Sequence, residues 1–251
     1  MSFPSTALAQ GKRLLMEAAL NLTANSRSLS ALSLRELARE AGLNPNTFYR
    51  HFKNLDDMGM AIIEEMSGQI RQPLRDLRRR AAESVIPPGS PPTSWEENAP
   101  INFVRSVQVN KETVKLFFDY VESNPNAFIM GVRELHGASP TLRKALRKLM
   151  VSFAEDMADD IEMLNLLPVL ERAPVFEMAE TISREMFLLS MDYIEQPGNR
   201  ELIAQKAENM IMTLSMGYVT LHGHGELMAG ALKQLTVQIK ENTTYVFGGK
   251  P

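Results

Sequence analysis

Cysteine is absent from the 251-residue chain, and so are long apolar runs. Without cysteine the chain can form neither a disulfide framework nor a thiolate that binds metal or acts as a nucleophile. No run reaches the roughly 18 apolar residues that a membrane-spanning helix needs, and Met1–Leu15 lacks the apolar core of a secretion signal. We therefore expect a cytoplasmic protein without a membrane segment.

Sequence patterns typical of enzymes and metal sites are also scarce. The chain has no glycine-rich phosphate loop, and no serine or histidine stands in a nucleophile motif. His222 and His224, with Glu226, offer too few ligands for a zinc site. We predict no catalytic residue, no metal and no cofactor. One acidic cluster, which we interpret as a solvated helix face, consists of Asp156, Asp159 and Asp160.

The charge of the chain is unevenly distributed. Residues 1–53 carry seven basic and three acidic side chains, a balance of +4. The whole chain sums to −3, so residues 54–251 carry −7. A basic amino-terminal part on an acidic body is typical of a head that binds a polyanion, although uneven solvated surfaces also produce such a division.

Helical periodicity dominates the chain, and no sustained strand-like alternation is present, so the predicted fold class is all-α. Five prolines in residues 84–100 predict an extended linker, in which Trp95 either docks onto the body or is exposed. Asn124, Ser139 and Asn199 are the expected caps of later helices. The expected helices outside residues 32–54 are 6–24, 55–83, 101–123, 125–136, 140–164, 174–195 and 200–221, with a further candidate at 226–240.

Three helix starts lie close together in residues 32–57. Ser33 is expected to cap the first helix, with Glu36 completing a capping box. Asn44 caps the second helix, which begins at Pro45, and Asn54 caps the third, with Asp57 reciprocating. Between the first two helices, Gly42 provides a tight turn because glycine accepts the left-handed conformation. Two short helices joined by such a turn form a helix-turn-helix.

The second of these helices has two contrasting faces. If Phe48 and Phe52 point inward, a helical wheel places Asn46, Arg50 and Lys53 on the opposite face, with Thr47 and Tyr49 on its flanks. A polar, positive face suits base edges and phosphates in a major groove, although a merely solvated face would look similar. The predicted core of this unit, completed by the first helix, consists of Leu34, Leu37, Ala38, Leu43, Phe48 and Phe52.

The segments 33–43 and 47–57 resemble the amino-terminal signature of the TetR-type repressors. The resemblance implies a three-helix DNA-binding head (residues 1–54) and a larger helical ligand-binding and dimerisation domain (residues 55–251). It also implies a homodimer that grips a palindromic double-stranded DNA operator. By position, the phosphate-contacting set is Ser33, Thr47, Tyr49, His51 and Lys53, and the base-reading candidates are Arg35, Pro45, Asn46 and Arg50. His51 could instead only bond to the start of the next helix.

Residues 124–139 resemble a branch of that family that represses unsaturated fatty acid synthesis and senses long acyl-CoA thioesters. This second resemblance implies a small apolar effector, with acyl-CoA as the candidate and Arg133 near His136 as candidate effector-binding residues. The methionines of the body could line an adaptable apolar cavity or fill the core.

We expect the two helices 174–195 and 200–221 to form the dimer interface, as the resemblance implies. Ile182, Met186, Leu189 and Tyr193 follow the spacing of a packed stripe. The sequence therefore predicts a ligand-responsive transcriptional regulator. It identifies neither the operator nor the regulated genes. The alternative is an enzyme acting on a lipid or cofactor, with a vestigial DNA-binding head.

Overall fold

Eight α-helices and three short 3₁₀ helices make up the secondary structure of the residues that the computed structural model describes, which are 4–24, 27–85, 95, 99–168 and 171–222. The predicted all-α class is confirmed. The α-helices are α1 (Pro4–Ala24), α2 (Leu34–Glu40), α3 (Leu55–Ser84), α4 (Ala99–Ser123), α5 (Pro125–Leu135), α6 (Pro140–Met163), α7 (Arg172–Glu195) and α8 (Arg200–His222). The 3₁₀ helices are η1 (Leu29–Ala31), η2 (Pro45–Arg50) and η3 (Pro197–Asn199).

The expected helix caps of the body are only partly correct. Ser139 caps α6, since its hydroxyl accepts a hydrogen bond from the Leu142 amide at 3.2 Å. Asn124 does not cap α5, because its side-chain amide donates instead to the Tyr120 carbonyl at 3.0 Å. Asn199 lies within η3 and donates to Gln196 Oε1 at 3.1 Å, so it does not cap α8 either.

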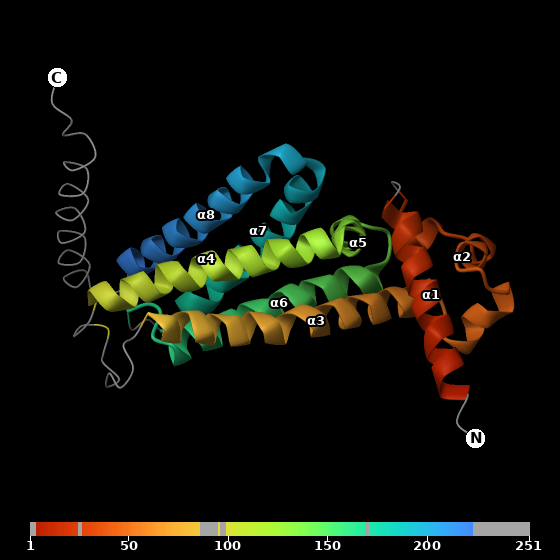
Figure 1. Ribbon diagram of the computed structural model, residues 1–251, viewed down its shortest axis with the longest axis horizontal. Helices are drawn as coiled ribbons and strands as arrows, with labels where there is room; N and C mark the ends of the chain where they lie inside the picture. Colours follow the sequence, from red (N-terminus) through yellow and green to blue (C-terminus); the bar gives the residue numbers. More distant parts are fainter. Residues whose placement is uncertain (1–3, 25–26, 86–94, 96–98, 169–170, 223–251) are drawn as a thin grey trace.

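The molecule is elongated, with α1 and α2 at one end and the long helices of the body running away from them (Figure 1). Helix α3 connects the two parts and packs against α4 and α6 along its length. Helix α7 packs against α6 and α8, and α8 returns to α4. Helix α3, which directly follows the predicted head, is therefore also part of the packed body.

One hydrophobic cluster crosses the predicted head–body boundary between residues 54 and 55. It joins Leu15 of α1 and Phe48 of η2 to Met58 of α3, Met130 of α5 and Leu142 of α6, all of which are almost fully buried. Because these side chains share one core, the head and the near end of the body are packed as a single unit.

A second cluster holds α4, α7 and α8 together. The predicted stripe Ile182, Met186, Leu189 and Tyr193 is buried in this cluster, where the Tyr193 ring stacks on Phe118 with centroids 4.4 Å apart. The stripe thus packs within one chain, and an interface formed by α7 and α8 would have to use other side chains.

Two expectations fall at the margins of the described residues. Helix α3 continues to Ser84 and α4 begins at Ala99, so the proline-rich segment is shorter than predicted, and Trp95 is docked with 8% of its surface exposed. The candidate helix 226–240 lies outside the described residues.

Candidate functional site

The three predicted caps of the head are present. Ser33 Oγ accepts from the Glu36 amide at 3.2 Å, and Asn44 Oδ1 accepts from the Asn46 amide at 2.9 Å. Asn54 Oδ1 accepts from the Asp57 amide at 2.8 Å, and the Asp57 carboxylate accepts from the amide of Lys53. These side chains satisfy amides that a helix start leaves without partners, and so fix where each element begins.

The capping box predicted for α2 is only half formed. The Glu36 carboxylate pairs with the Arg27 guanidinium instead of returning to Ser33. The turn after α2 matches the expectation, because Gly42 has φ +65° and the Leu43 amide donates to the Ala38 carbonyl at 2.8 Å.

The second element of the helix-turn-helix, η2, is a 3₁₀ helix rather than the expected α-helix. The amides of Thr47 and His51 each donate three residues back, to Asn44 and Phe48. With three residues per turn, Tyr49 lines up with Asn46 instead of lying on a flank. Like Asn46, Tyr49 is exposed, with 66% of its surface accessible, whereas Thr47 is half-buried.

The predicted inward and outward sides of η2 are otherwise as expected. Phe48 and Phe52 are 0% and 3% exposed, with their rings 5.6 Å apart, and Leu37 and Ala38 of α2 are buried beside them. Leu34 and Leu43 are half-buried against the same core. The aromatic pair therefore anchors η2 and leaves its polar side chains free to project outward.

The proposed DNA-contacting side chains are mostly accessible. Exposed are Ser33, Arg35, Pro45, Asn46, Tyr49, Arg50 and Lys53, and half-buried are Thr47 and His51. No ion pair between described residues involves Arg35, Arg50 or Lys53. Cations without an acidic partner keep their attraction for phosphates, so this surface can act as an electrostatic footprint for nucleic acid.

His51 occupies a different position from its exposed neighbours. Its ring faces Gly11 of α1, where an added Cβ would lie 2.8 Å from Nε2. Burial, and then the charges of Arg50 and Lys12, lower the pKa of His51 below its ordinary value. The absence of a side chain at Gly11 therefore lets the imidazole of His51 pack against α1.

An apolar cavity lies in the body between α3, α4, α5, α6 and α7. Its volume is about 110 Å³, well above the roughly 10–15 Å³ that one water requires. Met130, Met150, Met157 and Met186 are among its lining residues, together with aromatic rings such as Phe117, Phe128 and Phe187. The burial of Tyr120 in this wall raises its pKa to about 12.

Helix α5 links this cavity to the head. Met130 and Gly131 line the cavity, while the next turn of the same helix contacts the head. The Arg133 guanidinium donates to the carbonyls of Thr23 and Ala24 at the end of α1. Fully buried Glu134 accepts from the Leu29 amide of η1 at 2.7 Å.

The candidate effector-binding residues lie apart from this cavity. Arg133 points to α1, and His136 is exposed at the end of α5, so neither is among the cavity-lining residues. Any contact between these two residues and an effector would therefore lie outside the apolar cavity.

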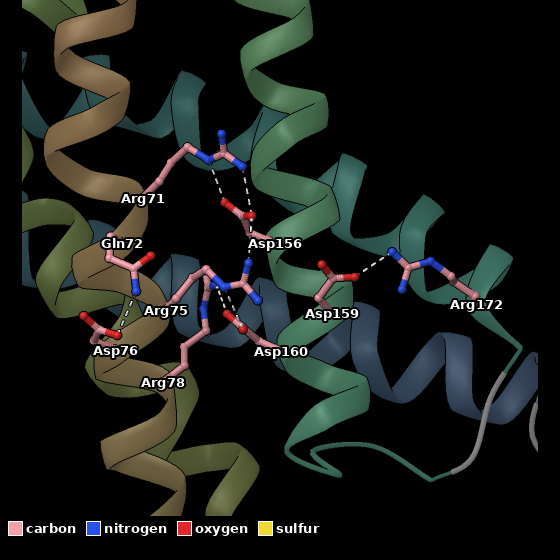
Figure 2. Close-up of polar contacts among 9 residues, drawn as sticks. All are labelled: Arg71, Gln72, Arg75, Asp76, Arg78, Asp156, Asp159, Asp160 and Arg172. Carbon is pink, nitrogen blue, oxygen red and sulfur yellow. Dashed lines mark hydrogen bonds and ion pairs between the residues drawn. The ribbon is translucent and has the colours of Figure 1, made fainter.

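A ladder of ion pairs fastens α3 to α6 (Figure 2). Arg71 Nε lies 2.6 Å from an Asp156 oxygen, and Arg75 bridges Asp156 and Asp160 at 3.3 and 3.2 Å. Arg78 Nη1 lies 2.7 Å from Asp160. The Asp156 hydrogen bond raises the pKa of Arg71, whereas burial lowers that of Arg78.

The prediction of a solvated acidic face is wrong for two of its three members. Asp156 and Asp160 are 7% and 3% exposed, and the arginines of α3 neutralise them. Only Asp159 remains at the surface, where it pairs with Arg172 (Figure 2). The sequence did contain a sign of this pairing. Arg71, Arg75 and Arg78 are spaced to lie on one face of α3, and Asp156 and Asp160 are spaced to lie on one face of α6.

The described parts of the chain show neither a membrane-spanning helix nor a cluster of metal ligands. None of the helices there is both long and apolar enough to cross a bilayer. The same residues contain no group of three or more histidine, aspartate and glutamate side chains suited to a metal ion. Of the weak candidate cluster 222–226, only His222 lies within the described residues.

Residues 15–59 match the model of the bacterial regulatory proteins, tetR family. Solved structures share the fold of most of the chain. The fatty acid degradation regulator FadR from Bacillus halodurans is 13% identical with a TM-score of 0.58, over 81% of this chain and 94% of its own. A putative TetR-family transcriptional regulator from Rhodococcus sp. is 15% identical with a TM-score of 0.56, over 82% and 99%.

A further similar structure was solved with a ligand. The transcriptional regulator FadR from Bacillus subtilis, in complex with stearoyl-CoA, is 15% identical with a TM-score of 0.54, over 82% of this chain and 98% of its own. At these identities the likeness concerns the fold.

Proposed function

Because the chain carries the amino-terminal domain of the tetR family on an all-helical, TetR-type fold, we propose that it is a ligand-responsive transcriptional regulator. It binds a palindromic operator as a homodimer and acts as a repressor. The observation that carries this proposal is the exposed surface of α2 and η2, where Arg35, Arg50 and Lys53 lack acidic partners among the described residues.

The proposed base-reading residues are Arg35, Pro45, Asn46 and Arg50. Arginine can pair bidentately with guanine and asparagine with adenine, whereas a lysine contributes mainly through phosphate charge. Ser33, Thr47, Tyr49, His51 and Lys53 form the proposed phosphate-contacting set. The alignment of Tyr49 with Asn46 in the 3₁₀ geometry supports a groove-facing position for both.

The proposed effector is a long-chain acyl-CoA, and regulation of fatty acid metabolism is the proposed role. The apolar cavity supports this, since its wall of methionine and aromatic side chains suits an acyl chain. The FadR structure in complex with stearoyl-CoA, which shares the fold, supports it as well.

The proposed mechanism is a population shift in the two helices that join the cavity to the head. Helix α3 lines the cavity with Ile62, Met66 and Ile70 and begins directly after Asn54. Helix α5 holds α1 through Arg133. An effector that displaces either helix changes the spacing of the two heads relative to the ~34 Å repeat of successive major grooves.

We propose that the dimer forms through α7 and α8. Three large apolar side chains of these helices are exposed, namely Leu188, Leu202 and Leu221. They differ from the stripe predicted from the sequence, which is buried within the chain.

The Arg50→Ala variant is expected to bind the cognate site about 1–3 kcal/mol more weakly while its affinity for unrelated DNA changes much less. Lys53→Ala is the matched control, because it should weaken binding to all sequences about equally. Both affinities are measured by mobility shift at one fixed salt concentration. An equal loss on every sequence after Arg50→Ala would remove its base-reading role.

The effector is tested on the same complex, using DNA that flanks the protein's own coding region. Palmitoyl-CoA is expected to change the apparent Kd by about 5–150-fold, the usual range of coupling between two sites. Free CoA, which has no chain for the cavity, should leave the Kd unchanged. No response to any saturated or unsaturated acyl-CoA would discard the fatty-acid role, and no binding to the flanking DNA would favour the enzyme alternative.

A further inference from the structure

A second cavity adjoins the first, at the end of the body away from the head. Its volume is about 80 Å³, and its walls include Trp95, Phe103 and Leu166. Arg78, Thr113, Met157 and Ile211 line both cavities. The two cavities therefore lie next to each other on either side of this shared wall, the junction, and together they are called the chamber.

The walls of the two cavities contain buried polar atoms without partners among the described residues. Thr113 Oγ1 on α4 and Ser183 Oγ on α7 are buried, and neither has a hydrogen-bond partner in the described part of the chain. Both side chains line the first cavity, and Thr113 lines the second as well. A buried hydroxyl without a partner is costly, so the Thr113 hydroxyl in the shared wall indicates a position suited to a polar group.

Asn110 adds a third such atom, one helical turn before Thr113 on the same face of α4. The Asn110 side chain is 9% exposed and lines the second cavity. Its Nδ2 donates to the Glu208 carbonyl at 2.9 Å, which fixes the amide so that Oδ1 is the atom without a partner among the described residues. This oxygen can only accept, so its natural partner is an N–H or O–H donor.

The charge at the junction is already compensated. Arg78 is the ionised side chain in the shared wall, and Asp160 neutralises it at 2.7 Å. An additional carboxylate would have to compete with Asp160 for this guanidinium in a buried environment. The junction is therefore better suited to an uncharged donor–acceptor group than to an anion.

We propose that the chamber binds an elongated amphiphile whose apolar chain occupies the first cavity and whose uncharged amide-like group lies at the junction. The N–H of the group donates to Asn110 Oδ1, and its carbonyl accepts from Thr113. The remainder of the ligand enters the second cavity beside Trp95. This inference rests on the proposed function, because it takes the first cavity as the effector site, and it specifies the hydrogen-bonding chemistry of a ligand there.

A matched pair of probes tests the site on the full-length protein without DNA. N-ethyldodecanamide and ethyl dodecanoate have the same length, and the N–H of the amide is replaced by an oxygen in the ester. Because Trp95 is the sole tryptophan of the chain and lines the second cavity, its fluorescence reports filling of that cavity. The amide is expected to bind about tenfold more tightly than the ester, and more tightly than dodecanoate.

Thr113→Val removes the hydroxyl while keeping the side-chain shape. It is expected to weaken binding of the amide about tenfold and to leave the thermal midpoint unchanged or higher, because the hydroxyl has no partner to lose. Thr181→Val is the control, since that exposed hydroxyl of α7 donates to the Glu177 carbonyl away from the chamber. Asn110→Ala should make the amide and the ester equivalent.

Equal binding of amide and ester by the wild-type protein would overturn the proposal, as would tighter binding of dodecanoate. Both results come from the unmodified chain, so they do not depend on whether a variant folds. If palmitoyl-CoA fails to change DNA binding while the amide–ester difference holds, the proposed effector is wrong and the site stands. If palmitoyl-CoA changes DNA binding but the amide and the ester bind equally, the regulator function stands and the proposed ligand chemistry is wrong.

Discussion

Asp160→Ala is expected to lower the free energy of unfolding by about 3–5 kcal/mol, because it leaves the Arg78 guanidinium buried without its partner. Both groups are inaccessible, with 4% of Arg78 and 3% of Asp160 exposed, and their atoms lie 2.7 Å apart. Arg75 also loses one of its two carboxylates. The loss is measured by urea unfolding at constant pH and protein concentration.

The same helix provides the control for this prediction. Asp159→Ala removes an exposed ion pair with Arg172 and should change the free energy of unfolding by no more than about 0.5 kcal/mol. Replacing both buried partners, as Arg78→Met with Asp160→Leu, should recover much of the loss, since a matched apolar pair carries no unpaired charge. If Asp160→Ala and Asp159→Ala cost the same, the ladder does not fasten α3 to α6.

Phe48→Ala is expected to destabilise the protein by about 3–5 kcal/mol and to abolish operator binding. The Phe48 ring is fully buried between α1, η2 and α3, and it holds the exposed side of η2 in place. Its truncation leaves a cavity in a core that also contains Met130 and Leu142 of the body. The unfolding free energy and the mobility shift are measured on the same preparation.

Tyr49→Ala is the control for Phe48→Ala. Its ring is 66% exposed, so its removal should change stability by about 0.5 kcal/mol or less, while DNA binding weakens. If Phe48→Ala leaves the unfolding free energy within 1 kcal/mol of the wild type, η2 is not anchored in the way described here.

The features predictable from the sequence were those with local causes. Ser33, Asn44 and Asn54 act on amides two or three residues away, and glycine at position 42 is needed for a turn within the same segment. The inward direction of Phe48 and Phe52 follows from helical spacing, and the family signature lies in the same stretch. The caps, the turn and the inward face of the head could therefore be predicted from the sequence.

Two of the features that were missed depend on partners that the sequence does not identify. Asp156 and Asp160 read as a surface face because the arginines that bury them are more than eighty residues earlier. The stripe of α7 could be assigned to a packed face, but the sequence does not say whether the partner is the same chain or a second copy. The 3₁₀ geometry of η2 was missed because α- and 3₁₀-helices differ little over six residues.

The shared core across residues 54 and 55 limits how far such heads can be exchanged between regulators. A graft of residues 1–54 onto a foreign body would separate Leu15 and Phe48 from Met130 and Leu142, and would deprive the α1 carbonyls of Arg133. A transplant that retains its operator preference must therefore carry α5 and the first turn of α6 with it. For this architecture, the unit that recombination can move is larger than the predicted head of residues 1–54.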